Sequence, residues 1–427
     1  MTTRYAQVGL GSRSWLYSIA IVNQHPDGNA LVGVCERNAG RLGQRLQWAR
    51  ANGLELRGYA PEEFDRMVAE CRPDAVIVTT DDVHHDRYIV RALELGCDVV
   101  TEKPMTIDAP RCQRILDAQA RSGRRITVTF NYRYSPPRAQ VKRLLAEGAI
   151  GEVLSLDFHW LLDTTHGADY FRRWHRRKEN SGGLLVHKAS HHFDLVNWWL
   201  GSVPERVFAS GRRAFYTPAT AERLGLAGRG ARCLGCPARS RCPFHLDLAG
   251  RGELKAIYLD HEQHDGYQRD RCVFSDEIDI EDAVAAVVDY RSGARLSYSL
   301  HAFMPWEGYT VAFNGTRGRL EHRMEEASYV AGNGSPPGAA RPEGSWIRLH
   351  LQGGSPREVP LDAGEGGHGG GDRLLARALF GPPADDPLGR CADERAGAWS
   401  ALTGIAANLS METGQAVQVG SLVRGLG

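Results

Sequence analysis

The chain has 427 residues, 42% of them hydrophobic and 24% charged, so it is long enough for two folded domains. Its 52 basic and 51 acidic residues nearly cancel, which argues against nucleic acid or an anionic membrane surface as the main partner. The chain leads directly into an apolar strand pattern, and no apolar run is long enough to span a bilayer. We therefore expect a cytoplasmic protein whose partner is a small molecule.

Residues 1–131 alternate short apolar runs with longer helical patterns, as strand-helix-strand units do. The strand candidates are 5–9, 30–36, 74–80, 97–102 and 126–131. The helical patterns lie near 14–23, 39–52, 61–70, 84–95 and 108–122. Because such crossovers are right-handed, this α/β pattern predicts a doubly wound parallel sheet of the Rossmann type, with a ligand site along one rim.

Residues 132–427 have a different rhythm, in which strand-like segments follow one another without intervening helices. The segments are 152–162, 205–213, 278–290, 294–302 and 309–314. They predict an α+β domain with an open, largely antiparallel sheet, whose apolar face favours a homodimer or homotetramer. Predicted loops and late helices complete the domain, at 331–344, 364–371, 372–380 and 393–413.

A glycine-containing turn joins the first strand to the first helix, which is the context that a dinucleotide fingerprint requires. Gly9 permits the tight turn, and Gly11 lets backbone amides approach a pyrophosphate. Ser14 departs from the usual Gly or Ala at the third position. Such turns are also found with a purely structural role. The cofactor contacts predicted here are Gly9, Gly11, Ser12, Arg13 and Ser14.

The second strand ends in Glu36 and Arg37, about 25 residues past Gly11. A carboxylate at this position accepts both ribose hydroxyls, so Glu36 favours NAD. Arg37 leaves NADP open, because it can hold a 2′-phosphate or stack on the adenine, or it is simply a solvated surface residue.

Thr-Glu-Lys-Pro-Met at 101–105 ends the fifth strand, and here the sequence resembles the Gfo/Idh/MocA family of glucose-fructose oxidoreductases and inositol dehydrogenases. Three further segments carry the resemblance: Thr-Thr-Asp-Asp-Val-His at 79–84, Asn-Tyr-Arg-Tyr at 131–134, and 182–194. The resemblance covers most of the chain. Together with the strand ends it implies cofactor contacts from Thr79, Thr80, His84, Glu102, Lys103 and Arg133.

The resemblance implies that Lys103 points at a substrate hydroxyl beside the nicotinamide. An ammonium there stabilises developing alkoxide charge and lowers the pKa of the hydroxyl. A cis peptide bond before Pro104 is compatible with such a turn. The alternative for Lys103 is a structural ion pair with Glu102.

Segment 182–194 is expected to open a helix that continues to residue 200, with His187 and His191 on one face. The resemblance puts His191 at the family's catalytic histidine, the general base. His187 stands where that family usually has an Asp, so we expect a rewired proton relay. Lys188 adds a second cation, which suits an acidic substrate. Helix packing and a metal site at the histidines are alternatives.

Two further residues are substrate-contact candidates. Tyr132 follows the last strand of the first domain and either touches substrate or, with Arg133, braces the domain junction. His368 lies in a glycine-rich loop where the backbone can approach a ligand closely.

An insertion at about 213–277 departs from the family pattern and is expected to cover the substrate rim. Its cysteines suit a structural zinc ion or, second, an iron-sulfur cluster, with disulfides and free thiols as alternatives. The candidate metal ligands are Cys233, Cys236, Cys242 and Cys272.

These features predict an NAD-dependent oxidoreductase acting on a ring hydroxyl of a sugar, glycoside or cyclitol, with Lys103, His191 and His187 as catalytic residues. One alternative is an NAD-dependent glycosidase that works by transient oxidation, elimination and re-reduction. Another is a non-catalytic sugar or cofactor sensor.

Overall fold

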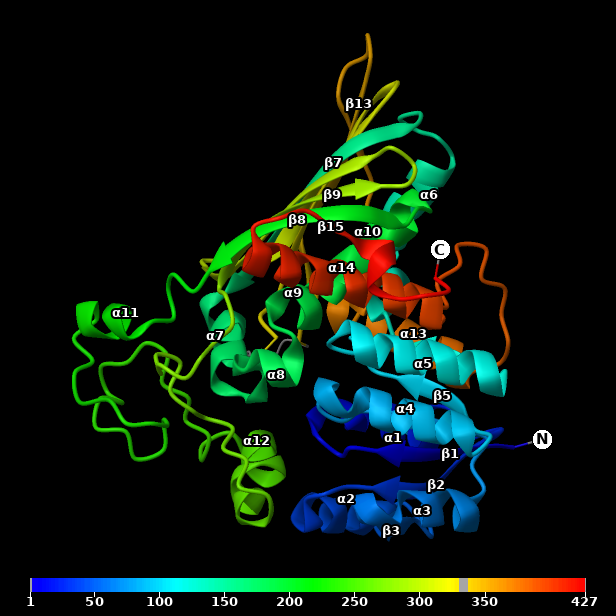
Figure 1. Cartoon of the computed structure of the whole chain (residues 1–427), viewed down its shortest axis with the longest axis vertical. Helices are drawn as coiled ribbons and strands as arrows, with labels where there is room; N and C mark the ends of the chain where they lie inside the picture. The colour runs from blue at the N-terminus through cyan, green and yellow to red at the C-terminus, as the bar shows by residue number, and fades with distance from the viewer. Residues whose placement is uncertain (1, 330–336, 427) are drawn as a thin grey trace.

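The computed structural model describes residues 2–329 and 337–426, and folds them into two domains (Figure 1). The first contains a six-stranded parallel sheet of order β3-β2-β1-β4-β5-β6. Its strands are β1 (Thr3–Val8), β2 (Asn29–Cys35), β3 (Arg57–Tyr59), β4 (Ala75–Val78), β5 (Asp98–Thr101) and β6 (Ile126–Val128). The connecting helices include α1 (Trp15–Ile19), α2 (Ala39–Ala51), α3 (Phe64–Cys71), α4 (His85–Glu94) and α5 (Ala109–Ser122). The predicted doubly wound domain is confirmed.

Helices cover both faces of this sheet, so a central strand is buried on both sides. All four residues of β4, Ala-Val-Ile-Val, are buried. The strand β3 is not among the sequence predictions, because it has only three residues and the first two, Arg57 and Gly58, are exposed. A short edge strand of this kind carries no apolar run that a pattern search can detect.

The second domain contains a nine-stranded sheet of order β14-β13-β12-β11-β7-β10-β9-β8-β15, in which only β7 and β10 pair in parallel. The strands are β7 (Val153–Asp163), β8 (Pro204–Arg212), β9 (Ala283–Tyr290), β10 (Arg295–Met304), β11 (Glu307–Gly315), β12 (Gly318–Glu326), β13 (Ala340–Leu351), β14 (Arg357–Val359) and β15 (Val417–Gln418). The predicted largely antiparallel sheet is confirmed. Strands β12 to β14 lie beyond the predicted segments. In β12 two of the four buried positions are the polar residues His322 and Glu326, so the apolar alternation typical of a half-buried strand is incomplete.

Helices pack between this sheet and the first domain (Figure 1). They are α6 (Pro136–Ala146), α7 (Thr164–Arg172), α8 (Lys178–Ser181), α9 (Leu184–His187), α10 (Ala189–Leu200), α13 (Gly371–Phe380) and α14 (Glu394–Thr413). Helix α14 packs on β8 and α10 on one side and on α5 and β6 on the other. Gly404 lets it approach α9 closely, since a Cβ there would lie 2.1 Å from the carbonyl oxygen of Leu185. The two domains therefore share one packed core.

The opposite face of the second sheet exposes the cross-strand pair Phe208 and Val287, which are 49% and 43% accessible. A homodimer or homotetramer through this face stays a prediction. Within the described ranges, no helix has the length and apolarity needed to cross a bilayer. The part of the predicted loop 331–344 up to residue 336 lies outside the described residues.

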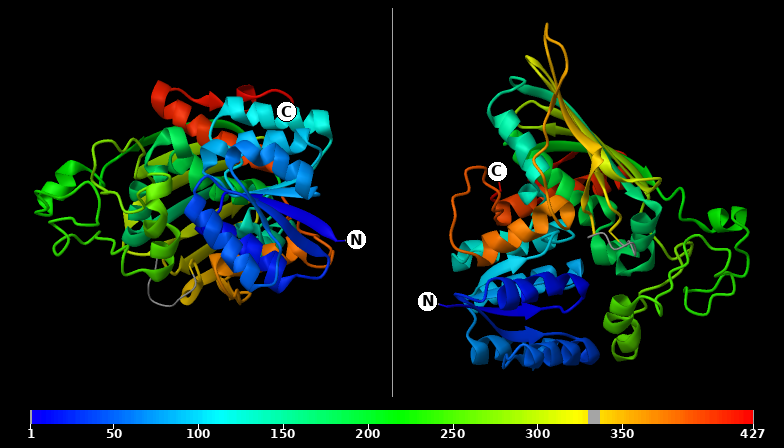
Figure 2. Two further views of the ribbon diagram at one scale, coloured as in Figure 1. Left: turned by 90° about the horizontal axis from the view of Figure 1, so that it is seen from below. Right: turned by 180° about the vertical axis from the view of Figure 1, so that it is seen from behind.

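The insertion projects from the side of the second domain in every view (Figure 2). It carries α11 (Pro218–Arg223), α12 (Gly252–Ile257) and the 3₁₀ segment η7 (Leu259–His264). Its cysteines lie beside Arg172 of α7, and α12 and η7 return to the first domain beside α2 (Figure 1).

Candidate active site

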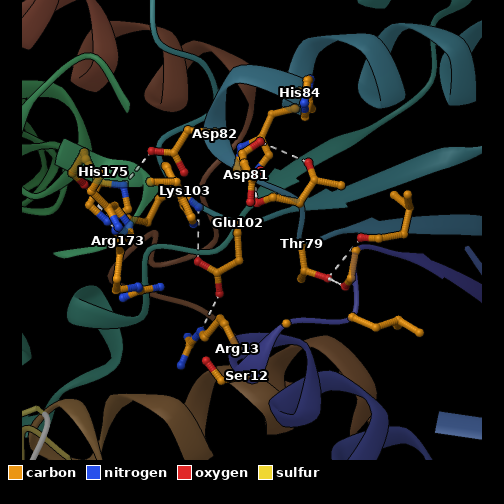
Figure 3. A pocket seen from close by; sticks show the side chains of 18 of the residues that line it. Ser12, Arg13, Thr79, Asp81, Asp82, His84, Glu102, Lys103, Arg173 and His175 are labelled. Carbon is orange, nitrogen blue, oxygen red and sulfur yellow. Dashed lines mark hydrogen bonds and ion pairs between the residues drawn. The ribbon is translucent and has the colours of Figure 1, made fainter. Parts of the chain in front are cut away.

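A cavity of about 510 Å³ lies between the domains, at the carboxyl ends of the parallel strands (Figure 3). Most of the predicted site residues line it: Gly9, Gly11, Ser12, Arg13, Glu36, Arg37, Thr79, Thr80, His84, Glu102, Lys103, His187, Lys188, His191 and His368. Ser14, Tyr132 and Arg133 do not. The strand ends therefore gather residues from distant parts of the chain at one cleft.

The glycine turn packs directly on the end of β4. Gly9 has a φ of +83°, and a Cβ there would lie 2.7 Å from backbone atoms of Thr79 and Thr80. The Thr79 hydroxyl donates to the carbonyl oxygen of Gly9 at 2.6 Å. Gly11 has free space where its side chain would be, apart from the hydroxyl of Tyr258 at 3.6 Å. This close approach fits a turn that admits a pyrophosphate to its amides.

Ser14 lies beneath the turn, fully buried, and its hydroxyl explains its departure from Gly or Ala. The hydroxyl donates to the carbonyl oxygen of Gly11 at 2.5 Å and accepts from Arg45 Nη2 at 2.8 Å. The guanidinium of Arg45 is buried and makes no ion pair with a described carboxylate; burial lowers its pKa to about 9. Ser14 thus supports the turn and places a cation beneath it.

Glu36 lies at the end of β2, facing the cleft. Its Oε2 accepts from the amide of Leu10 at 2.5 Å, and its Oε1 accepts from Arg41 Nη2 at 2.8 Å. Arg37 pairs with Asp81 at 3.1 Å. A carboxylate fixed beside the glycine turn fits the recognition of ribose hydroxyls, so the residues here suit NAD.

Glu102 and Lys103 diverge at the end of β5 (Figure 3). Glu102 accepts from Arg13 Nε and Tyr17 Oη, both at 2.6 Å, and makes no ion pair with Lys103. The alternative of a structural Glu102–Lys103 ion pair is therefore wrong. Lys103 Nζ instead donates to the carbonyl oxygen of His187 at 3.1 Å. Burial lowers the pKa of Lys103, and Asp82 and Glu102 oppose that shift. Its peptide bond to Pro104 is cis, as anticipated.

The helix predicted to open within 182–194 and to run to residue 200 is interrupted at Lys188, between α9 and α10. Because of this break, the two histidines have separate surroundings. His187 Nδ1 lies 2.5 Å from Asp82 Oδ2, and its ring packs edge-on to His175 at 4.2 Å. His191 stacks on Tyr132 at 4.1 Å. Among the described residues no group of three or more His, Cys, Asp or Glu could hold a metal ion, so a metal site at these histidines is not supported.

Asp82 supplies the carboxylate that position 187 lacks, and it comes from the other domain. Burial raises the pKa of Asp82 and lowers the pKa of His187 well below its usual range. A charged pair is thus disfavoured, and the two groups can hold an exchangeable proton at the cleft wall. The rewired relay stays a prediction; the carboxylate that meets His187 belongs to Asp82, which the sequence analysis did not single out.

His191 has the properties of a neutral base. It is 4% accessible, and its Nδ1 has no hydrogen-bond partner among the described residues. Burial, then the charges of Lys103 and Lys188, lower the pKa of His191 well below its usual range. The imidazole is therefore unprotonated at neutral pH and able to accept a proton.

Tyr132 is fully buried and supports cleft residues from behind. Its hydroxyl accepts from Lys188 Nζ at 3.0 Å and lies 2.8 Å from the hydroxyl of Tyr329. The ammonium of Lys188 also lies over the rings of Trp160 and Tyr329, at 4.7 and 4.8 Å. The burial of Tyr132 therefore argues against its direct contact with a substrate.

His368 is linked to the cofactor side of the cleft. Its Nδ1 lies 2.7 Å from Asp372 Oδ2, and Asp372 Oδ1 pairs with Arg13 Nη1 at 3.0 Å. Asn131 Nδ2 donates to the same Asp372 oxygen at 2.8 Å. The predicted glycine-rich loop therefore delivers an oriented imidazole to the cleft.

Arg133 is buried away from the cleft, which corrects its assignment as a cofactor contact. Its guanidinium binds both oxygens of Asp194, at 2.8 and 2.6 Å, and the carbonyl of Gly389. We expect Arg133→Leu to destabilise the protein by about 3–5 kcal/mol, because Asp194 would remain buried without a partner. Urea denaturation measures the loss, and the Kd of NADH at low urea should be unchanged; a weakened Kd would restore the cofactor role.

The four cysteines of the insertion line one small cavity of about 20 Å³, with Arg172 beside them. All are free thiols, and they form no metal-binding group among the described residues. Burial raises the pKa of Cys233 and of Cys242. The prediction of a zinc or iron-sulfur site at Cys233, Cys236, Cys242 and Cys272 is therefore not supported by the described residues.

Several cleft residues were missed by sequence reasoning. His85 is buried between the carbonyl oxygens of Pro104 and Thr80, at 2.8 and 3.1 Å, and fixes two strand ends. The others are Asp82, His166, Tyr170, Arg173, His175, Tyr258, Tyr267 and Tyr329. Only Asp82 and His85 lie in or next to a quoted motif, 79–84. The rest come from irregular segments or short helices without a recognisable spacing.

The site and fold define a two-domain oxidoreductase with a dinucleotide-binding turn. The model of the oxidoreductase family NAD-binding Rossmann fold matches residues 3–130, and that of the family's C-terminal alpha/beta domain matches residues 142–339. The chain therefore belongs to the Gfo/Idh/MocA oxidoreductase family, and the resemblance drawn from its motifs is confirmed.

Individual relatives agree with this assignment. The chain is 41% identical over 357 residues to YteT of Bacillus subtilis (strain 168), covering 81% of each protein. It is 27% identical over 209 residues to the scyllo-inositol 2-dehydrogenase (NAD(+)) of that strain, covering 49% of this chain and 57% of the relative. The WlbA dehydrogenase of Bordetella pertussis, solved with NADH and UDP-GlcNAcA, has a TM-score of 0.65 at 18% identity, covering 98% of this chain and 97% of that one.

Proposed function

We propose that the protein is an NAD-dependent dehydrogenase that oxidises a ring hydroxyl of a sugar, glycoside or cyclitol. The observation that carries the proposal is one cleft, lined by the glycine turn and Glu36 at one end and by Lys103, His187 and His191 at the other. The similarity to an inositol dehydrogenase supports a polyhydroxylated ring as substrate.

A nicotinamide held by the glycine turn and Glu36 would supply the hydride acceptor for the carbon that bears the reacting hydroxyl. Lys103 donates a hydrogen bond to the hydroxyl oxygen and stabilises the negative charge that develops on it. His191 accepts the hydroxyl proton, since its imidazole is neutral and buried. Asp82 and His187 hold a second exchangeable proton on the same wall. His187 links these groups, because its backbone carbonyl orients Lys103 and its imidazole contacts Asp82.

An acidic group on the substrate is favoured by the charge at the substrate end of the cleft. Lys188 and Arg173 both line it, and Lys188 has no described carboxylate within ion-pair distance. Arg173 also forms an ion pair with Asp169, with 3.4 Å between Nη1 and Oδ2. A carboxylate or phosphate on the substrate ring would form ion pairs with these cations. The WlbA dehydrogenase was solved with UDP-GlcNAcA, an acidic sugar nucleotide.

A substrate screen tests the function. Purified protein is incubated with NAD⁺ and inositols, aldoses, hexuronates and aryl glycosides, and both NADH and released aglycone are measured. A dehydrogenase accumulates NADH in proportion to the substrate consumed. Release of aglycone without NADH would instead show the redox-neutral glycosidase, and ligand binding without either product would show a sensor.

A pH profile tests the acidic substrate. Burial lowers the pKa of Lys188 to about 8, so its ammonium is charged below that pH and loses its charge above it. We expect kcat/KM for a hexuronate to fall as pH rises through about 8, while kcat/KM for the matching uncharged aldose lacks this descent. Lys188→Met should abolish the descent; parallel profiles for the two sugars would refute the role of Lys188.

A further inference from the structure

Residues 258–267, in the second half of the insertion, pack against the nucleotide-binding domain. Tyr258 Oη accepts from the amide of Ser12 at 3.2 Å, within the glycine turn. Asn38 Nδ2 donates to the carbonyl oxygen of His261 at 2.9 Å. The ring of His261 packs so closely on Gly40 that a Cβ there would lie 2.2 Å from its Nδ1. The segment is thus fixed along the start of α2.

This segment places Asp265 at the end of the cleft that Glu36 defines. Asp265 Oδ2 lies 2.7 Å from Arg41 Nη2 and 3.8 Å from Arg37 Nε. Arg41 is also bound by Glu36, and Arg37 by Asp81. The two cations that line this end of the cleft are therefore matched by three carboxylates.

We propose that Asp265 is a positioning residue that makes the protein select NAD⁺ over NADP⁺, so that cofactor preference is set partly by the insertion. The inference rests on the NAD-binding domain and not on the proposed sugar chemistry. A 2′-phosphate on the adenosine ribose needs free guanidinium groups near the ribose. Here Asp265 holds Arg41 beside Glu36 and forms a longer ion pair with Arg37, so neither guanidinium is available to a phosphate.

The burial of the cluster makes this effect strong. The side chains of Arg41 and Asp265 are each 8% accessible, so water screens their charges only weakly. Burial raises the pKa of Asp265, but Arg41 and its hydrogen bonds outweigh this and lower it. Asp265 is thus ionised at neutral pH and would also repel a phosphate brought beside it.

Binding measurements on the full chain test the proposal without any substrate. Quenching of tryptophan fluorescence gives the Kd of NADH and of NADPH. The wild-type protein should bind NADH more tightly. Asp265→Asn should tighten NADPH binding by about tenfold or more, because one nearby negative charge is removed and Arg41 keeps only one of its two carboxylate partners. Asp260→Asn is the matched control: it lies in the same segment but pairs with Lys255, and should leave the ratio unchanged.

A double variant shows whether the gain acts through Arg41. Asp265→Asn combined with Arg41→Met should lose the added NADPH affinity. Equal affinities of the wild type for NADH and NADPH, an unchanged ratio in Asp265→Asn, or a gain that survives without Arg41 would each overturn the proposal. Thermal melting and NADH binding verify folding, and Asp265→Ser serves as the second test should the Asn variant unfold.

Discussion

Replacing Lys103 with methionine is expected to lower kcat/KM by about 10²–10³, which is the usual cost of removing one group that stabilises a developing oxyanion. Lys103 is buried, lines the cleft and makes no described ion pair that would compete for its charge. Its ammonium is thus reserved for the substrate oxygen. Initial rates of NADH formation, with the substrate found in the screen, measure the loss.

The Kd of NADH separates chemistry from folding in this variant. It should stay near the wild-type value, because the glycine turn and Glu36 are unchanged. Lys178→Met provides a matched control, since Lys178 pairs with Glu281 at 2.6 Å and does not line the cleft. Full activity of Lys103→Met would contradict the proposed mechanism.

Replacing His191 with asparagine is expected to lower kcat by about 10²–10⁴, the range over which a general base contributes. Asparagine retains part of the contact with Tyr132 but cannot accept the hydroxyl proton. In the wild type the pKa of His191 is lowered well below its usual range by burial. Oxidation should therefore remain fast at pH 6.5 and decline only at more acidic pH, where the imidazole becomes protonated.

The variant should also lose that acidic decline, because the titrating base has been removed. A purely structural role for His191 would lower the rate without changing the shape of the pH profile. His192→Asn is the comparison: His192 Nδ1 lies 2.7 Å from Tyr298 Oη, and its ring is fully buried behind the cleft. An unaltered acidic limb in His191→Asn would assign the base to another residue.

Local sequence patterns were sufficient for the nucleotide-binding half of the site. Gly9, Glu36 and Lys103 each follow a short buried strand, and parallel strands bring their carboxyl ends to one rim. The type of the second sheet also followed from its pattern. Strands β12 to β14 were not predicted, since buried polar residues such as His322 and Glu326 interrupt the apolar alternation.

The remaining features depend on contacts between distant segments. Nothing at position 82 predicts that its carboxylate will meet His187 from another domain. The break at Lys188 separates two histidines that an unbroken helix would align. The spacing of the cysteines suggested a metal, whereas the fold leaves them as buried or half-buried thiols.

The pairing of Asp82 with His187, and of Lys103 with the backbone of His187, has a consequence for the timing of catalysis. Each contact joins the nucleotide-binding lobe to the substrate lobe, so a hinge movement that opens the crevice would separate His187 from Asp82 and Lys103 at once. For the proposed reaction we therefore expect proton and hydride transfer only in the shut conformation, in which bulk water has least access to the reacting carbon.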